Sequence, residues 1–282
     1  MVGTVDTARL NDAFQNGYAL GGFQAYDTVT TNGIIRAAEQ VGAPVIVQAG
    51  SSAFGGCGRD TLIGLVLAAA RSAQVPVGVH LDHCRDLDEV AYCLDHGYTS
   101  VMFDGSHLSF ADNVAHTAKA VELAHRYGAW CEGELGAIVG GEDVSEDVVA
   151  GSYTDPSEAR AFIDATGVDV LAVAVGNVHG MSNTPATLDL TQLAAIQQAC
   201  RHPLVLHGAS GVDDATLRAA IGLGVVKINV NTEVRRGILS AVTATHQTFV
   251  AGDNYAGLLD ALTTAASDVV GEKLDVFGCV NR

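Results

Sequence analysis

Residues 170–175 read VLAVAV and residues 203–208 read PLVLHG, two runs in which apolar residues occupy successive positions. A half-exposed antiparallel strand would alternate apolar with polar residues, whereas a parallel strand covered by helices is apolar on both faces. Each run is followed by a Gly-rich or Asn-rich turn and then by a stretch rich in Ala and Leu. The pattern therefore predicts buried parallel strands in repeated strand–turn–helix units.

Six further runs of this kind bring the number of predicted strands to eight. The eight predicted strands are Tyr18–Phe23, Pro44–Ala49, Val75–Leu81, Ser100–Phe103, Trp130–Leu135, Val168–Val175, Pro203–Leu206 and Val225–Val230. Eight such units favour an α/β fold of the (β/α)8 TIM barrel type, with extra helices at Asp6–Gln15 and Leu258–Lys273. An open doubly wound sheet is less favoured, because the turn GSSAFGGCGRD (50–60) lacks GxGxxG spacing. We expect residues 1–282 to form a single barrel domain.

Composition disfavours several classes of partner. The chain of 282 residues carries 32 acidic and 15 basic residues, a formal charge of -17. We therefore expect neither nucleic acid nor a membrane surface as a partner, and an anionic substrate would need a local site of positive potential. The first residues do not resemble a secretory leader, and six scattered cysteines predict reduced, mostly buried thiols. We expect a cytoplasmic protein.

Polar residues gather at the carboxyl ends of the predicted strands, where (β/α)8 barrels build their active sites. Three histidines, His83, His179 and His207, end three different strands. Packing alone does not explain three imidazoles at one rim, and three neutral imidazoles with an open position suit a catalytic zinc or similar divalent ion. We expect these three to ligate the metal, with Asp104 and Glu134 as alternate or outer groups.

Glycines, hydroxyl residues and amides follow the sixth, seventh and eighth predicted strands. They are Gly180, Gly208, Ala209, Ser210, Gly211, Asn229, Val230, Asn231 and Thr232. Barrels often bind phosphate with the backbone amides and hydroxyls of these last loops. The segment thus meets the need for local anion binding, and its GASG turn directly follows the expected ligand His207.

Six ordered motifs carry a resemblance to a known family. They are VHLDHC (79–84), SVMFDGSHL (100–108), EGELG followed by GGED (132–143), AVGNVHG (174–180), PLVLHGASGV (203–212) and KINVNTEVR (227–235). Together they resemble the class II, metal-dependent ketose-phosphate aldolases, including the tagatose-bisphosphate and fructose-bisphosphate aldolases, from about the first strand to the terminal GCVNR. The resemblance implies a (β/α)8 barrel, a homodimer or homotetramer, and a zinc-like divalent ion, with a monovalent cation near the phosphate.

The resemblance also implies an activity and residue roles. The family cleaves a ketose 1-phosphate or 1,6-bisphosphate reversibly into dihydroxyacetone phosphate and an aldehyde, through a metal-stabilised enediolate. Asp82 matches the acid/base at the C4 hydroxyl, and Glu142 matches a carboxylate that transfers protons at the dihydroxyacetone phosphate carbon. Asn229 matches the residue that orients the enediolate. The metal ligands, the alternate carboxylates and the phosphate cradle match the residues named above.

Asp82 and His83 set a geometric condition on this assignment. Neighbouring residues of a regular strand point to opposite faces. The strand must therefore twist or end at this point if both side chains are to reach one substrate.

Two other functions stay open. Lys227 in VVKINV (225–230) could form a Schiff base in a lysine-dependent aldolase, although its plainer role is a structural ion pair and the rim histidines would be unexplained. A non-catalytic sugar-phosphate-binding homologue would have lost a ligand or an acid/base, and none of the expected residues is missing.

Two departures from the family pattern concern the substrate: the first leaves the sugar stereochemistry open, and the second concerns the distal end. Relatives usually read FN with another Asn three residues later, where this chain has Phe23-Gln24 and Asp27. Bisphosphate-cleaving relatives carry an arginine before the final helix, yet residues 237–272 contain no Lys or Arg. Arg59 is the nearby candidate replacement. We therefore expect a preference for ketose 1-phosphates with an uncharged distal end, because a second phosphate would meet mainly repulsion.

Overall fold

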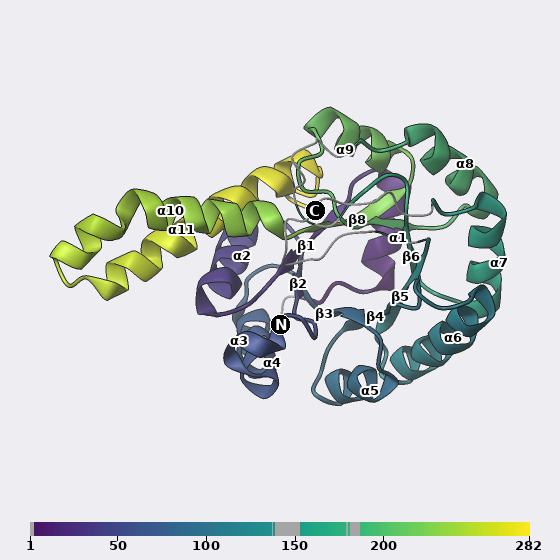
Figure 1. Cartoon of the computed structure of the whole chain (residues 1–282), viewed down its shortest axis with the longest axis horizontal. Helices are drawn as coiled ribbons and strands as arrows, with labels where there is room; N and C mark the ends of the chain where they lie inside the picture. The colour runs from purple at the N-terminus through teal and green to yellow at the C-terminus, as the bar shows by residue number, and fades with distance from the viewer. Residues whose placement is uncertain (1–2, 137, 139–152, 179, 181–186) are drawn as a thin grey trace.

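The computed structural model describes residues 3–136, 138, 153–178, 180 and 187–282, and its strands form a closed parallel barrel (Figure 1). The strands follow one another around the barrel in chain order, and β1 closes it by pairing with β8. The predicted (β/α)8 TIM barrel is therefore confirmed. The strands are β1 (Leu20–Gln24), β2 (Val45–Gln48), β3 (Val77–Cys84), β4 (Ser100–Phe103), β5 (Trp130–Leu135), β6 (Val170–Val173), β7 (Leu204–Leu206) and β8 (Val225–Val230).

Helices surround the barrel and connect its consecutive strands (Figure 1). α1 (Thr7–Asn16) precedes β1 and α11 (Tyr255–Val276) follows the last unit, as the sequence predicts for both ends. α10 and α11 pack against each other in a hairpin that extends away from the barrel. The other helices are α2 (Thr28–Val41), α3 (Phe54–Cys57), α4 (Arg59–Ser72), α5 (Leu87–Asp95), α6 (Phe110–Arg126), α7 (Pro156–Thr166), α8 (Leu190–Cys200), α9 (Asp214–Gly222) and α10 (Thr232–Ala251).

The chain's cysteines agree with one further expectation. Five of the six cysteines are buried, and Cys57 is exposed, which confirms mostly buried thiols. Among the described helices, none combines the length and the apolar character that crossing a bilayer requires.

Alternation along the strands decides which side chains enter the barrel. In β5, Glu132 and Glu134 share one face, while a Cβ on Gly133 would lie 3.0 Å from Phe162 of the surrounding helices. Glu132 meets Lys227 of β8 across the interior. The barrel therefore holds charged groups in its interior as well as apolar ones.

Strand β3 leaves regular pairing near its end. Leu81 pairs with Val101, but Cys84 pairs with Phe103, so β3 contains one extra residue over this interval. His83 lies there with a φ of 46°, in the left-handed region that non-glycine residues rarely adopt. β3 was predicted to end at Leu81 but extends to Cys84. Its bulge fulfils the geometric condition on Asp82 and His83, whose side chains both reach the rim.

Gly50, just after β2, makes room for this bulge. A Cβ on Gly50 would lie 2.3 Å from the backbone oxygen of Asp82. Any larger residue would force one of the two backbones to move. The close approach of β2 and β3 therefore depends on glycine at this position.

We expect Gly50→Ala to lower the free energy of unfolding by about 1–3 kcal/mol, the usual cost of overpacking a site that cannot relax. Urea denaturation measures this loss. Gly55→Ala is the matched control, because a Cβ on Gly55 has open space around it and should leave stability nearly unchanged. Equal stability of the two variants would contradict the role given to Gly50.

Candidate active site

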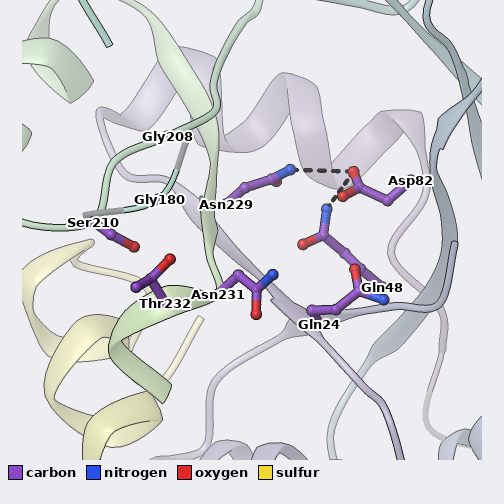
Figure 2. Close-up of a pocket in the computed structure, with 9 residues that line it drawn as sticks. All are labelled: Gln24, Gln48, Asp82, Gly180, Gly208, Ser210, Asn229, Asn231 and Thr232. Carbon is purple, nitrogen blue, oxygen red and sulfur yellow. Dashed lines mark hydrogen bonds between the residues drawn. The ribbon is translucent and has the colours of Figure 1, made fainter. Parts of the chain in front are cut away.

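A pocket with an empty volume of about 350 Å³ lies at the carboxyl ends of the strands (Figure 2). Its lining combines residues from the ends of β1, β2, β3 and β8 with residues from the loops after β6 and β7. They are Gln24, Gln48, Asp82, Gly180, Gly208, Ser210, Asn229, Asn231 and Thr232. Seven of these were predicted as site residues, whereas Gln24 and Gln48 were not. Ala209 and Val230, also predicted, are buried and do not line this pocket.

Asp82 is held in the pocket wall by two amide side chains. Its Oδ1 accepts hydrogen bonds from Gln48 Nε2 at 2.7 Å and from Asn229 Nδ2 at 3.2 Å (Figure 2). These two amides thus fix the orientation of the Asp82 carboxylate in the pocket.

His83 and His207 face each other at the rim. His83 Nε2 lies 2.8 Å from His207 Nδ1, and the second nitrogen of each ring turns toward a carboxylate. His207 Nε2 lies 2.5 Å from Glu132 Oε1, and His83 Nδ1 lies 3.5 Å from Asp104 Oδ2. Each ring therefore turns one nitrogen toward the other ring and its second nitrogen toward a carboxylate, and a carboxylate in that position orients an imidazole that ligates a metal ion.

The electrostatic surroundings favour a neutral His207. Burial, together with the positive charges of His83 and Lys227, holds the pKa of His207 well below its usual range. A neutral imidazole is the form that ligates a metal ion. His207 is therefore in its ligating form at neutral pH.

Asp104 and Glu134 lie beside His83, but their pKa values shift in opposite directions. Burial raises the pKa of Glu134 to about 8, and its Oε2 has no hydrogen-bond partner among the described residues. Burial acts in the same sense on Asp104, but hydrogen bonds from His83, Ser106 and Arg85 outweigh it and hold the pKa of Asp104 well below its usual range. A buried carboxyl oxygen without a partner is a feature that a bound cation would explain.

Two groups of candidate ligands share His83. One consists of Asp82, His83 and His207, and the other of His83, Asp104 and Glu134, with the ligand atoms of each group within 4.8 Å of one another. Nitrogen and carboxylate donors at this spacing suit a divalent ion such as zinc. The residues present therefore fit a metal centre. Predicted ligand His179 and predicted catalytic residue Glu142 lie outside the described residues.

Lys227 forms a buried ion pair within the barrel. Its Nζ donates to Glu132 Oε2 at 2.7 Å, and both side chains are fully buried. The sequence left two roles open for Lys227, a structural ion pair and a Schiff base. The structure shows the ion pair. Sequence reasoning assigned no role to Glu132, although its spacing of two from Glu134 indicates that both face the interior.

The phosphate cradle expected from the sequence lies at the start of α10. Asn231 is the N-cap residue, but no described side chain caps the helix, and Asn231 Oδ1 instead accepts a hydrogen bond from the Tyr26 hydroxyl at 2.9 Å. Arg235 Nη2 lies 3.4 Å from the Thr232 hydroxyl. Uncapped amides at a helix N-terminus, with an arginine one turn away, can bind an anion. Gly208 is required nearby, because a Cβ there would lie 2.4 Å from Val178 O.

A (β/α)8 barrel with a metal-binding donor set beside an anion cradle has the features of a metal-dependent enzyme that acts on phosphorylated substrates. The family model described as fructose-bisphosphate aldolase class-II matches residues 6–282. The chain is 38% identical over 274 residues to a sulfofructosephosphate aldolase of Alkalicoccus urumqiensis, covering 97% of this chain and 96% of that protein. The chain belongs to the class II fructose-bisphosphate aldolase family.

Solved structures agree with this assignment. The YdjI aldolase of Escherichia coli K12 is similar with a TM-score of 0.87 and 32% identity, over 99% of this chain and 98% of that one. The fructose-bisphosphate aldolase of Campylobacter jejuni, 20% identical with a TM-score of 0.82 over 99% and 97% of the two chains, shares the fold. Family membership supports a lyase of the aldolase type.

We expect Lys227→Met to lower the free energy of unfolding by about 3–5 kcal/mol, because it leaves Glu132 as a buried charge without its partner. The double variant Lys227→Met/Glu132→Gln should recover part of this loss, since no charge is then stranded. Urea denaturation of both proteins measures the difference. A double variant less stable than the single one would contradict this account of the pair.

Proposed function

We propose that the protein is a divalent-metal-dependent aldolase that reversibly cleaves a ketose 1-phosphate into dihydroxyacetone phosphate and an aldehyde. The observation that carries the proposal is the facing pair His83 and His207, which lies beside Asp82 and Asn229 at the rim of the barrel. The family to which the chain belongs supports the reaction type.

His83 and His207, with His179 as the predicted third ligand, would hold the ion. Zinc is the expected metal, and Asp104 and Glu134 are the expected alternate groups. When bound, the ion supplies a Lewis acid that stabilises the negative charge developing as the C3–C4 bond breaks.

The side chains around the ion have separate roles in proton transfer and in orienting the substrate. Asp82 accepts the C4 hydroxyl proton in cleavage and returns it in condensation, with Gln48 and Asn229 fixing its carboxylate. Asn229 Nδ2 also lies 3.1 Å from His207 Nδ1, so the amide stands between the acid/base and the metal ligand and can orient the enediolate. Glu142 is the predicted carboxylate for proton transfer at the dihydroxyacetone phosphate carbon.

The C1 phosphate is proposed to bind at the start of α10. Gly180, Gly208, Ser210, Asn231 and Thr232 line that side of the pocket (Figure 2). Backbone amides and hydroxyls there supply donors, as the sequence predicts. A monovalent cation near this phosphate stays a prediction.

Arg59 gives no support for a second phosphate site. Its guanidinium lies 3.7 Å from the centre of the Tyr92 ring, and it pairs with Asp60 at 3.4 Å and Glu89 at 3.6 Å. Arg59 does not line the pocket. We therefore infer a substrate whose distal end is not a phosphate. The relative in Alkalicoccus urumqiensis is named a sulfofructosephosphate aldolase. A sulfonate is therefore a further candidate for the distal group, beside the uncharged groups expected from the sequence.

The two alternative functions have less support. A Schiff base would require Lys227 to leave Glu132 and to contact substrate from a fully buried position. A non-catalytic homologue would not need the hydrogen-bonded acid/base Asp82. A homodimer or homotetramer and a cytoplasmic location stay predictions; light scattering of the purified protein measures the first.

We expect a chelator to abolish cleavage and added zinc to restore it. His207→Ala should lose most of the bound metal and the activity, because a site with three protein ligands loses much of its affinity with one of them. Metal analysis and a coupled assay for dihydroxyacetone phosphate measure both quantities. Activity that resists chelator, with borohydride trapping of substrate on Lys227, would favour the Schiff-base enzyme.

Asp82→Asn tests the acid/base separately from the metal. We expect kcat for cleavage to fall by about 10²–10⁴-fold, the usual contribution of a positioned acid/base, with metal content unchanged. Arg36→Gln, which changes a surface residue that does not line the pocket, is the control and should leave kcat nearly unchanged. Loss of metal in Asp82→Asn would instead make Asp82 a ligand.

The distal end of the substrate is tested by a panel of ketose phosphates. We expect kcat/KM for tagatose and fructose 1-phosphates, or for a sulfonated fructose 1-phosphate, to exceed that for the matching 1,6-bisphosphates. The reason is that no arginine is among the described residues that line the pocket, so a second dianion would lack a guanidinium partner there. A preference for the bisphosphates that vanishes in Arg59→Ala would show that Arg59 turns toward the substrate after all.

A further inference from the structure

Arg85 and Asp104 form an ion pair at the edge of the candidate active site. Arg85 follows β3 and Asp104 follows β4, and Arg85 Nε and Nη2 both donate to Asp104 Oδ2, at 3.1 and 2.8 Å. Oδ1 accepts from the hydroxyl and backbone N–H of Ser106, at 2.6 and 3.2 Å. Both oxygens of this carboxylate are therefore engaged by donors.

The bulge in β3 brings this pair together. If regular pairing continued from Leu81 and Val101, Cys84 would lie beside Asp104. The observed pairing of Cys84 with Phe103 shifts β3 by one residue and places Arg85 beside Asp104. The same irregularity thus turns the His83 side chain toward the rim and brings Arg85 next to Asp104.

Asp104 also belongs to one of the two candidate ligand groups that share His83. His83 Nε2 faces His207, while His83 Nδ1 lies 3.5 Å from Asp104 Oδ2 and 3.9 Å from Glu134 Oε2. A divalent ion therefore has two competing positions on opposite sides of one imidazole ring. The position with His207 is the one whose group includes the acid/base of the pocket.

We propose that Arg85 is a positioning residue that keeps Asp104 from ligating the metal ion and so confines the ion to the position beside His207. Arg85 engages Oδ2, the Asp104 oxygen that also lies near His83 Nδ1. A guanidinium keeps its charge at every physiological pH. Asp104 then serves as an outer carboxylate that orients the His83 ring. The inference rests on the proposed metal dependence.

An ordinary surface ion pair would not keep a carboxylate from ligating a metal ion. The Arg85 side chain is 59% exposed, but the Asp104 side chain is only 4% exposed. Without the guanidinium, a buried carboxylate would lie beside His83 and the partnerless oxygen of Glu134, and these are donors that a divalent ion prefers. Removal of Arg85 is thus expected to strengthen metal binding, whereas mere loss of structure would weaken it.

The test measures Co²⁺ affinity of the metal-free protein by competition with a chromophoric chelator. We expect Arg85→Gln to bind Co²⁺ about tenfold or more tightly, because a nearby positive charge is removed and a carboxylate is released. The Co²⁺ absorption spectrum should change with the ligand set. Arg85→Gln/Asp104→Asn should lose this gain. Arg36→Gln, which removes the partner of Asp260 on the surface, is the matched control and should bind Co²⁺ like the wild type.

Three outcomes would overturn the inference, and they are distinguishable. Unchanged or weaker Co²⁺ binding by a folded Arg85→Gln protein would overturn it while leaving the metal-dependent function in place. A gain that persists in the double variant would also overturn it, because Asp104 would not be the group released. Wild-type protein that binds neither Co²⁺ nor Zn²⁺ would overturn the proposed function together with this inference.

Discussion

At the end of β3 the backbone of His83 takes a φ of 46°, in a region that costs an ordinary residue about 1–2 kcal/mol. Neighbouring contacts maintain it: Gly50 lets β2 approach the Asp82 backbone, and the backbone N–H of Asp104 donates to the Cys84 carbonyl at 2.7 Å. Without this turn, Asp82 and His83 would point to opposite faces of the strand. The proposed acid/base and a candidate metal ligand can be consecutive residues because the strand is irregular there.

A series of buried hydrogen bonds extends from the middle of the barrel to this turn. Lys227 donates to Glu132, Glu132 accepts from His207 Nε2, and Asn229 connects His207 Nδ1 with Asp82. Each member orients the next, so the buried ion pair determines which nitrogen of His207 faces the rim. This explains why a barrel interior contains charges that apolar residues could replace at lower desolvation cost.

The apolar pattern of the sequence predicts β4, β5 and β8 with the bounds that the structure has, because turns flank their apolar runs. It ends β3 too early, since Asp82 and His83 are polar residues of the strand. The rule that active sites lie at strand ends correctly brings Asp82, His83 and His207 to one rim. It cannot place Arg85 beside Asp104, because that contact depends on a one-residue shift of register that no local pattern encodes.

A protein with a formal charge of -17 that binds a phosphate dianion must create positive potential locally. Several cations near the strand ends already have carboxylate partners: Lys227 pairs with Glu132, Arg85 with Asp104, and Arg59 with Asp60 and Glu89. The start of α10 contributes backbone amides that no described side chain caps. The field of a helix end falls off within about one turn, so it acts on a phosphate at the cradle and not on one at the far end of a sugar. If the C1 phosphate binds at the start of α10, as we propose, that helix end leaves a second phosphate uncompensated, and this is the physical basis of the proposed selection for the distal group.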